Sequence, residues 1–198
     1  MPRKKEFDPD VALTKAMHFF WQNGYENTSI RDLISITGVN FYGLYSSLGD
    51  KKEIFLKSLD EYIKMYISAL NAHKVDSQEV STAVAEVFHT LLGFLDSNGH
   101  IGCMVCNAAI EVAPSDNETA LKMQTHREQV EAYWRSMLVK VLEKEELIKP
   151  ERLINCAEFL CTQVYGLSML LRAQSDRALI QRHIDFSAKL AVSLLSEK

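Results

Sequence analysis

Apolar residues recur at intervals of three and four positions along almost the whole chain, separated by charged and polar residues. On an α-helix this spacing places the apolar side chains on one face, which can then pack against the rest of the protein. Strict alternation of apolar and polar residues, which is typical of half-buried strands, appears nowhere over a useful length. The pattern therefore predicts an all-α fold.

The first 49 residues are predicted to form three short helices. Each predicted helix starts after a side chain that can accept hydrogen bonds from the first turn, and each ends at a glycine. Only a short turn separates the second helix from the third, which suggests a helix-turn-helix. The residues that mark these starts and ends are, in order, Asp8 with Pro9, Gly24, Thr28 or Ser29, Gly38, Asn40 and Gly49.

The predicted third helix carries aromatic rings around much of its circumference, although it has barely two turns. A single buried face cannot accommodate all of them. A helix-turn-helix resolves this, because the aliphatic residues pack inward while Tyr42, Tyr45 and the first turn enter the major groove of DNA. Phe41 is left open between a core position and a DNA contact. The inward residues in this interpretation are Val39, Leu44 and Leu48.

Six further amphipathic segments follow. The first of them opens with a capping-box pattern of Asp50 and Glu53. It links the three predicted helices of residues 1–49, which we call the reading unit, to the rest of the protein. Ser115 with Glu118 forms a second such pattern. Ser175 or Asp176 is the predicted cap of the last helix. The segments span about 50–73, 77–95, 101–113, 115–142, 151–173 and 175–195.

The segment 151–173 is apolar over most of its circumference, so other helices must cover every side of it. The final segment carries an apolar stripe as well. Two such helices from each of two subunits can build a four-helix bundle, and we therefore predict a homodimer. The predicted interface residues are Leu160, Val164, Leu167, Leu171, Phe186, Leu190 and Leu194.

The chain has 198 residues, a hydrophobic content of 47% and a net charge of -4, which suits a packed globular protein. A nucleic-acid binder with this charge must concentrate its cations locally. Residues 1–57 carry 8 Lys and Arg against 7 Asp and Glu, which leaves 14 against 19 for the remainder. A basic arm of Arg3, Lys4 and Lys5 opens the chain, either as a DNA-backbone contact or as a solvated terminus.

The start of the chain has no apolar region of the kind found in secretory signals, and no uninterrupted apolar run reaches the ~20 residues that cross a membrane. The four cysteines lie inside apolar helical patterns. These features predict a reduced, cytoplasmic setting and no membrane partner.

Cys103 and Cys106 are three positions apart and therefore share one helical face. A metal site would need two further close ligands, and a redox pair would need a lowered thiol pKa. Buried cysteines are more commonly small apolar fillers, so we expect no metal and no cofactor. An all-α thiol oxidoreductase using this pair is the alternative function, although the histidine that alkylhydroperoxidase-like enzymes carry one turn on is Ile110 here.

Several motifs in the first 55 residues follow the order of a known family. They are Phe20-Trp-Gln-Asn-Gly-Tyr25, Thr28-Ser-Ile-Arg-Asp-Leu33, Gly38-Val39, Leu44-Tyr45 and Gly49-Asp-Lys-Lys-Glu-Ile-Phe55. Together they closely resemble the amino-terminal DNA-binding domain of TetR-type (TetR/AcrR) transcriptional regulators. The resemblance implies a helix-turn-helix DNA-binding domain at 1–49 and a helical ligand-binding and dimerisation domain at 50–198.

The resemblance also implies which residues meet DNA. Thr28 and Arg31 stand at a helix start, where backbone N–H groups, a hydroxyl and a guanidinium can bind one phosphate. Tyr45 resembles a family tyrosine whose hydroxyl meets the DNA backbone, and Lys51 sits at a positively polarised helix N-terminus. The family's base-reading positions, where many relatives carry lysine, glycine or small hydroxyl residues, are occupied here by Asn40, Phe41 and Tyr42.

The implied function is a transcriptional regulator, usually a repressor in such families, that binds double-stranded operator DNA as a homodimer and is released by a small-molecule effector. The effector would favour one arrangement of the middle helices, swing the 50–73 helix and change the separation of the two reading helices. A protein-interaction module with a vestigial reading unit is a further alternative. The residues expected at the effector pocket are Cys103, Met104, Cys106, Met123, His126, Trp134, Met137, Phe159 and Tyr165.

Overall fold

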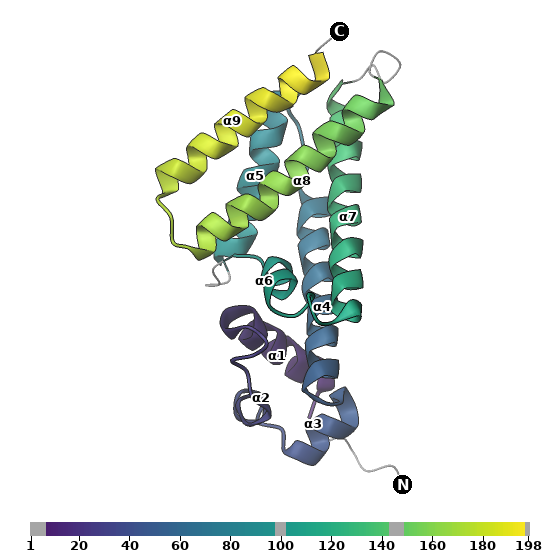
Figure 1. Cartoon of the computed structure of the whole chain (residues 1–198), viewed down its shortest axis with the longest axis vertical. Helices are drawn as coiled ribbons and strands as arrows, with labels where there is room; N and C mark the ends of the chain where they lie inside the picture. The colour runs from purple at the N-terminus through teal and green to yellow at the C-terminus, as the bar shows by residue number, and fades with distance from the viewer. Residues whose placement is uncertain (1–6, 98–101, 143–148, 197–198) are drawn as a thin grey trace.

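The computed structural model describes residues 7–97, 102–142 and 149–196, and all regular secondary structure in these ranges is helical, as predicted. Figure 1 shows an elongated molecule with α1, α2 and α3 at one end and with α8 and α9 crossing the front of the other. The helices are α1 (Pro9–Asn23), α2 (Ile30–Thr37), α3 (Phe41–Leu48), α4 (Lys51–Ala72), α5 (Val80–Ser97), α6 (Met104–Glu111), α7 (Asn117–Leu142), α8 (Pro150–Arg172) and α9 (Arg177–Ser196).

The boundaries of the first four helices follow from local chemistry. The side chains of Asp8 and Asn40 each accept a backbone hydrogen bond at 2.9 Å in the first turns of α1 and α3. Asp50 and Glu53 form the predicted capping box at the start of α4. At α2 the cap is Ser29 rather than Thr28. The glycines that end α1, α2 and α3 with a positive φ are Gly24, Gly38 and Gly49.

Some later boundaries differ from the prediction. The side chain that caps α7 is Asp116 rather than Ser115, because its carboxylate accepts hydrogen bonds from the backbone N–H and the hydroxyl of Thr119 at 3.1 and 2.6 Å. α6 ends at Glu111, before Pro114 is reached, and α5 begins at Val80. α5 continues through Ser97, so the first half of the break predicted at 96–99 is helical, while residues 98 and 99 and the basic arm of residues 3–5 lie outside the described residues.

α4 carries the reading unit and continues into the rest of the protein (Figure 1). Near its start, Phe55 and Tyr62 contact Phe20 and Trp21 of α1, with ring centroids 5.2 and 4.8 Å apart. All four side chains are buried, and burying each large apolar side chain contributes about 1.5–3 kcal/mol. Further along, α4 packs against α5 and α7. The first three helices are therefore fixed to one end of α4, which continues as a single helix into the rest of the protein.

α8 packs against α7 and α9, and α9 also packs against α5. Leu160, Val164 and Leu167 are at most 3% exposed within the single chain, so their predicted place between subunits is corrected to the intramolecular core. The apolar pattern showed that α8 is covered on most of its sides. It did not show which sides are covered by helices of the same chain and which by another subunit. The large apolar side chains that stay exposed on α8 and α9 are Ile154, Met169, Phe186 and Val192.

Among the described residues, α8 is the one helix with the length and composition of a membrane span. Its most apolar window is 44% buried inside the protein, and core helices pass the same test. The packing of α8 against α7 and α9 accounts for this apolar character.

Candidate nucleic-acid interface

α3 divides its side chains between the core and the solvent in the way that the sequence predicts. Leu44 and Leu48 are buried, as is Val39 in the preceding turn. On the other side, Tyr42 is 84% exposed and Tyr45 is 57% exposed. The aliphatic side therefore anchors α3, and the aromatic side faces outward at the end of the molecule.

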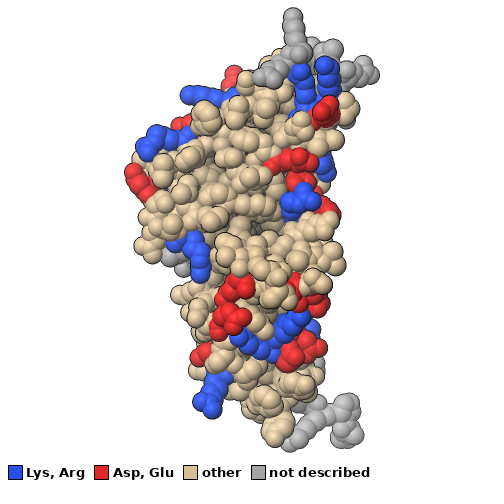
Figure 2. Space-filling view, in the orientation of Figure 1, with Lys and Arg blue, Asp and Glu red and all other residues tan. Residues whose placement is uncertain are grey.

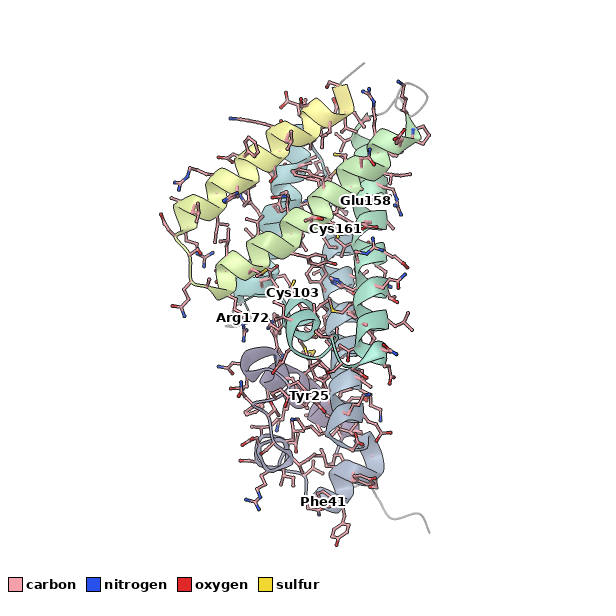
Figure 3. All side chains as sticks on the ribbon, in the orientation of Figure 1. Tyr25, Phe41, Cys103, Glu158, Cys161 and Arg172 are labelled. Atoms are coloured by element: carbon pink, nitrogen blue, oxygen red, sulfur yellow. The ribbon has the colours of Figure 1, made fainter. Side chains whose placement is uncertain are left out.

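The outward rings of α3 form a cluster, which we call the aromatic cluster of Phe41, Tyr42 and Tyr45. Phe41 lies edge-on to Tyr42 at 5.8 Å and stacks on Tyr45 at 5.9 Å between ring centroids. Phe41 itself is 49% exposed, so its alternative prediction as a core residue is wrong. Figure 3 shows Phe41 at the tip of the reading unit, far from Cys103. Asn40 is exposed beside the cluster and uses Oδ1 to cap α3.

The start of α2 carries one exposed cationic side chain, and its capping residues are hydrogen-bonded to each other. The hydroxyl of Ser29 donates to the carboxylate of Asp32 at 2.6 Å, and these hydrogen bonds hold the pKa of Asp32 below its usual value. Arg31 is exposed. Thr28 is only 1% exposed, and its hydroxyl donates to Gly24 O at 2.7 Å. The hydroxyl that the sequence assigns to a phosphate is therefore committed to the α1–α2 turn.

Two lysines of α4 hold the reading unit together. The ammonium of Lys51 lies 4.1 Å from the centroid of the Tyr25 ring, and such cation–π contacts contribute about 0.5–1 kcal/mol at exposed sites. Lys57 donates from Nζ to Leu48 O at 2.6 Å, at the negatively polarised end of α3. This role of Lys57 could not be predicted from the sequence, because nothing in the pattern separates it from any other solvated lysine on α4.

α6 is bonded to the reading unit at both of its ends. At its last residue, the two carboxylate oxygens of Glu111 accept hydrogen bonds from the backbone N–H groups of Tyr25 and Glu26, at 2.9 and 2.8 Å. Just before its first turn, Gly102 O accepts a hydrogen bond from Trp21 Nε1 at 2.8 Å. No local signal in the sequence gives the partners of Glu111, because they lie 85 and 86 positions away along the chain.

Gly24 makes the approach of Glu111 possible. Its φ is +83°, and a Cβ placed there would lie 2.8 Å from the Glu111 carboxylate. Both the backbone conformation and the space therefore favour glycine at this position. The side chain of Glu111 can approach the α1–α2 turn this closely only because residue 24 has no side chain.

Polar and sulfur-bearing side chains meet in the interior where α4, α6, α7 and α8 converge. Tyr62 donates its hydroxyl to Cys103 Sγ at 3.2 Å. His126 Nδ1 lies 3.2 Å from Tyr165 Oη, and burial lowers the pKa of His126 to about 4. The described part of the chain holds no group of three or more His, Cys, Asp or Glu side chains placed to bind a metal ion.

Two cavities lie outside this interior cluster. One, of about 420 Å³, lies between the end of α4 and the middle of α7 and includes Met137. The other, of about 400 Å³, lies among α1, α6 and α8 and includes Cys106. The residues predicted to line a single effector pocket therefore do not meet in one cavity. His126 and Tyr165 contact each other, and Trp134 packs on Phe88. Met137 and Cys106 line different cavities.

The remaining residues predicted at the effector pocket lie in the core or pack against it. Cys103 and Met104 are buried at the start of α6. Met123 and Phe159 are half-buried against the core, on α7 and α8. Several residues that line these cavities were not predicted from the sequence. Asn71, His73 and Arg172 lie at helix ends, where there is no periodic signal. Tyr133 lies within α7, where the apolar pattern did not distinguish a cavity position from a core position.

Solved structures share this fold. A cysteine mutant of the TetR family transcriptional regulator CifR, complexed with 26 bp double-strand operator DNA, matches 96% of this chain and 98% of its own at a TM-score of 0.77 and 22% identity. A TetR family regulator from Cytophaga hutchinsonii matches the full length of both chains at a TM-score of 0.78 and 17% identity. At these identities the likeness concerns the fold.

Curated relatives extend the likeness to sequence. No family model matches the chain. The uncharacterized HTH-type transcriptional regulator YezE of Bacillus subtilis is 29% identical over 94% of this chain and 97% of its own length. The HTH-type transcriptional repressor ComR of Escherichia coli is 30% identical over 86% of this chain and 82% of its own length. The chain therefore belongs to the TetR family of DNA-binding transcriptional regulators.

Proposed function

We propose that this protein is a cytoplasmic, homodimeric repressor that binds a palindromic operator and leaves it when a small molecule binds among its middle helices. In this proposal residues 1–49 form the DNA-binding domain and residues 50–198 the effector and dimerisation domain. The observation that carries the proposal is the aromatic cluster, which is exposed at the tip of a short helix whose opposite side is anchored in the core.

The expected DNA contacts divide into two kinds. Arg31, Tyr45 and Lys51 bind phosphates and fix the position of the protein on the duplex. Asn40, Phe41 and Tyr42 face base edges, where an amide pairs with adenine and aromatic rings touch thymine methyl groups. Thr28 supports these contacts from beneath, since its buried hydroxyl closes the turn that presents α2.

Dimerisation through α8 and α9 is supported by their outward surface. Ile154 and Met169 on α8 and Phe186 and Val192 on α9 are all more than a third exposed. Figure 2 shows that the surface over these helices is largely free of charged side chains on the face turned to the viewer. Leu171, Leu190 and Leu194 of the original prediction are half-buried and border this surface. A second copy would cover the apolar side chains and set the spacing of two reading units.

For the effector we propose the cavity between α4 and α7. Tyr133 Oη and His73 Nε2 belong to residues that line it, and both atoms are buried without a hydrogen-bond partner among the described residues. A ligand with polar groups would satisfy them, while Ile67, Val75 and Met137 offer apolar contacts. Because α4 also carries the reading unit, a shift at this end of the helix reaches α3.

A gel-shift assay tests the proposal, using palindromic duplexes from the region upstream of the gene itself. We expect a shifted band at low salt for the wild-type protein and a strongly weakened one for the Arg31→Ala, Tyr45→Phe double variant. Absence of any shift at low salt with the wild-type protein would contradict the proposed function.

A further inference from the structure

We propose that Cys103 and Cys106 form an internal disulfide when the protein meets a hydroperoxide, and that this bond lowers its affinity for operator DNA. The inference goes beyond effector binding, and it rests on the DNA-binding role. The observations that carry it are the position of the two thiols at the start of α6 and the hydrogen bonds that tie both ends of α6 to the reading unit.

The two sulfurs lie at a helix start, an environment that favours the thiolate form of cysteine. Cys103 is the N-cap of α6 and Cys106 is its third residue, so both lie on the first turn, near the positive end of the helix. The hydroxyl of Tyr62 donates to Cys103 Sγ from the side of α4. A Cys-X-X-Cys arrangement and a helix N-terminus are two of the settings in which protein thiols become reactive.

The same contacts divide the two thiols into a nucleophile and a proton donor. Burial by itself raises the pKa of Cys103, but hydrogen bonds from Cys106, Tyr62 and the backbone N–H groups of Cys106 and Val105 outweigh it and lower that pKa. The hydrogen bond to Cys103, followed by burial, raises the pKa of Cys106. Cys103 is therefore the thiol that loses its proton more readily, and Cys106 is the donor in the hydrogen bond between them.

The chain supplies an internal control in its other two cysteines. Burial raises the pKa of Cys156 and of Cys161 to about 11, so both remain protonated near neutral pH. Cys106, by contrast, lines the 400 Å³ cavity among α1, α6 and α8, which gives a water-sized oxidant a route toward the pair. Only Cys103 and Cys106 combine a polarised thiol with such a route.

The reaction balances with one hydroperoxide. The Cys103 thiolate attacks the terminal peroxide oxygen and the O–O bond breaks, which gives a sulfenic acid and, after protonation, one molecule of water or alcohol. Cys106 sulfur then attacks the Cys103 sulfur, the S–O bond breaks and water leaves with the proton of Cys106. The two thiols lose two electrons in total, and the peroxide gains them.

Closing this disulfide replaces the hydrogen bond between the two sulfurs with a covalent bond of about 2.05 Å. Cys103 is the N-cap and its backbone is extended, so we expect it and the neighbouring Gly102 to move toward Cys106 as the bond forms. Movement toward α8 is blocked, because Gly102 is already so close that a Cβ on it would lie 2.9 Å from Ser168 O. The change is therefore passed to Trp21 through Gly102 O and to the α1–α2 turn through Glu111.

The first experiment follows the bond itself. We treat the reduced full-length protein with hydrogen peroxide, count free thiols after denaturation and map the linked peptides by mass spectrometry. We expect the count to fall from four to about two with a Cys103–Cys106 link. The Cys156→Ser, Cys161→Ser variant should form the same link, and Cys106→Ser should not. Four remaining thiols, or a link through Cys156 or Cys161, would overturn the proposal.

The second experiment measures the consequence. The probe is a duplex selected from random sequences by the reduced wild-type protein, and its affinity is measured before oxidation, after oxidation and after re-reduction with dithiothreitol. We expect affinity to fall about tenfold on oxidation and to recover, a typical coupling between sites. The Cys156→Ser, Cys161→Ser control should respond equally, and Cys106→Ser should not respond.

The outcomes separate the two proposals. If the reduced protein selects no duplex, the DNA-binding role fails. If it selects one and the disulfide forms, yet oxidised and reduced proteins bind it equally well, the inference drawn from α6 is wrong while the function stands.

Discussion

His126 shows how a single buried residue can make stability depend on pH. It is fully buried on α7, between the Tyr66 ring at 4.9 Å and the Tyr165 hydroxyl, and its Nε2 has no hydrogen-bond partner among the described residues. Burial lowers its pKa from 6.5 to about 4. Between these values the unfolded chain binds a proton that the folded protein does not, so stability is lost as pH falls.

We therefore expect the free energy of unfolding to decrease from about pH 7 toward pH 4, with His126 contributing at most about 1.4 kcal/mol per pH unit. Urea titrations across this range measure it. The His126→Gln variant should show a flatter profile than the wild type, whereas His183→Gln, at an exposed position on α9, should not. Parallel profiles for wild type and His126→Gln would show that His126 does not carry the effect.

Tyr42 offers a test of DNA contact that leaves the fold intact, since it is 84% exposed. Removing its ring by Tyr42→Ala should weaken operator binding by about tenfold, or about 1.4 kcal/mol, the scale of an aromatic residue central to an interface. The thermal midpoint should barely change. Leu121→Ala is the matched control, because Leu121 is 63% exposed on α7, outside the helices α1, α2 and α3. Equal DNA affinity for the two variants would remove Tyr42 from the interface.

At the scale of helices, α6 is the element that joins the reading unit to the interior. Its links depend on contacts between residues far apart in sequence, such as Glu111 with Tyr25 and Trp21 with Gly102. Its neighbours on α8 and α4 leave it little freedom. We therefore expect a change in α6 to reach the α1–α2 turn through these hydrogen bonds.

The Glu111→Ala variant tests this link. It leaves the N–H groups of Tyr25 and Glu26 without their acceptor, and we expect a loss of about 1–3 kcal/mol in unfolding free energy. Hydrogen exchange at these two amides should also become faster. Glu158→Ala is the control, as Glu158 is exposed on the outer side of α8 (Figure 3). Unchanged exchange in Glu111→Ala would mean that the carboxylate does not hold the turn.

The sequence was informative where structure follows from neighbouring residues. The sequence predicted caps such as Asp8, Asn40 and Asp50, and it predicted the inward side of α3. A cap or an amphipathic face depends only on residues within one or two helical turns. The partners of Glu111 and the covered sides of α8 were not, since they depend on which distant helix packs there. Thr28 illustrates the limit: its type suits a phosphate contact, but the α1–α2 turn uses its hydroxyl.

At the scale of the whole molecule, binding to DNA should depend steeply on salt, although the net charge is -4. Each neutralised phosphate contributes about -0.9 to the slope of log affinity against log salt. Arg31→Ala should reduce the magnitude of the slope by about one. Lys64→Ala, at an exposed position on α4, should leave it unchanged. A slope unaffected by Arg31→Ala would exclude this guanidinium from the phosphate contacts.

In the proposed dimer, the surface of α8 and α9 sets the spacing of the two reading units. Phe186 is 64% exposed, and its replacement by glutamate places a charge where we propose that a second copy binds. The Phe186→Glu variant should sediment as a monomer and lose about tenfold or more in operator affinity, because two half-sites then bind independently. A variant that remains dimeric would place the subunit contact elsewhere.

Photo-crosslinking is the direct test of whether the exposed side of α3 enters the groove of operator DNA, as we propose. A selected duplex carrying 5-iodouracil in place of thymine is irradiated with the reduced protein, and the linked peptides are identified by mass spectrometry. We predict crosslinks within residues 40–45, at the aromatic cluster and Asn40. Crosslinks confined to helices outside the reading unit, such as α8 and α9, would contradict the account.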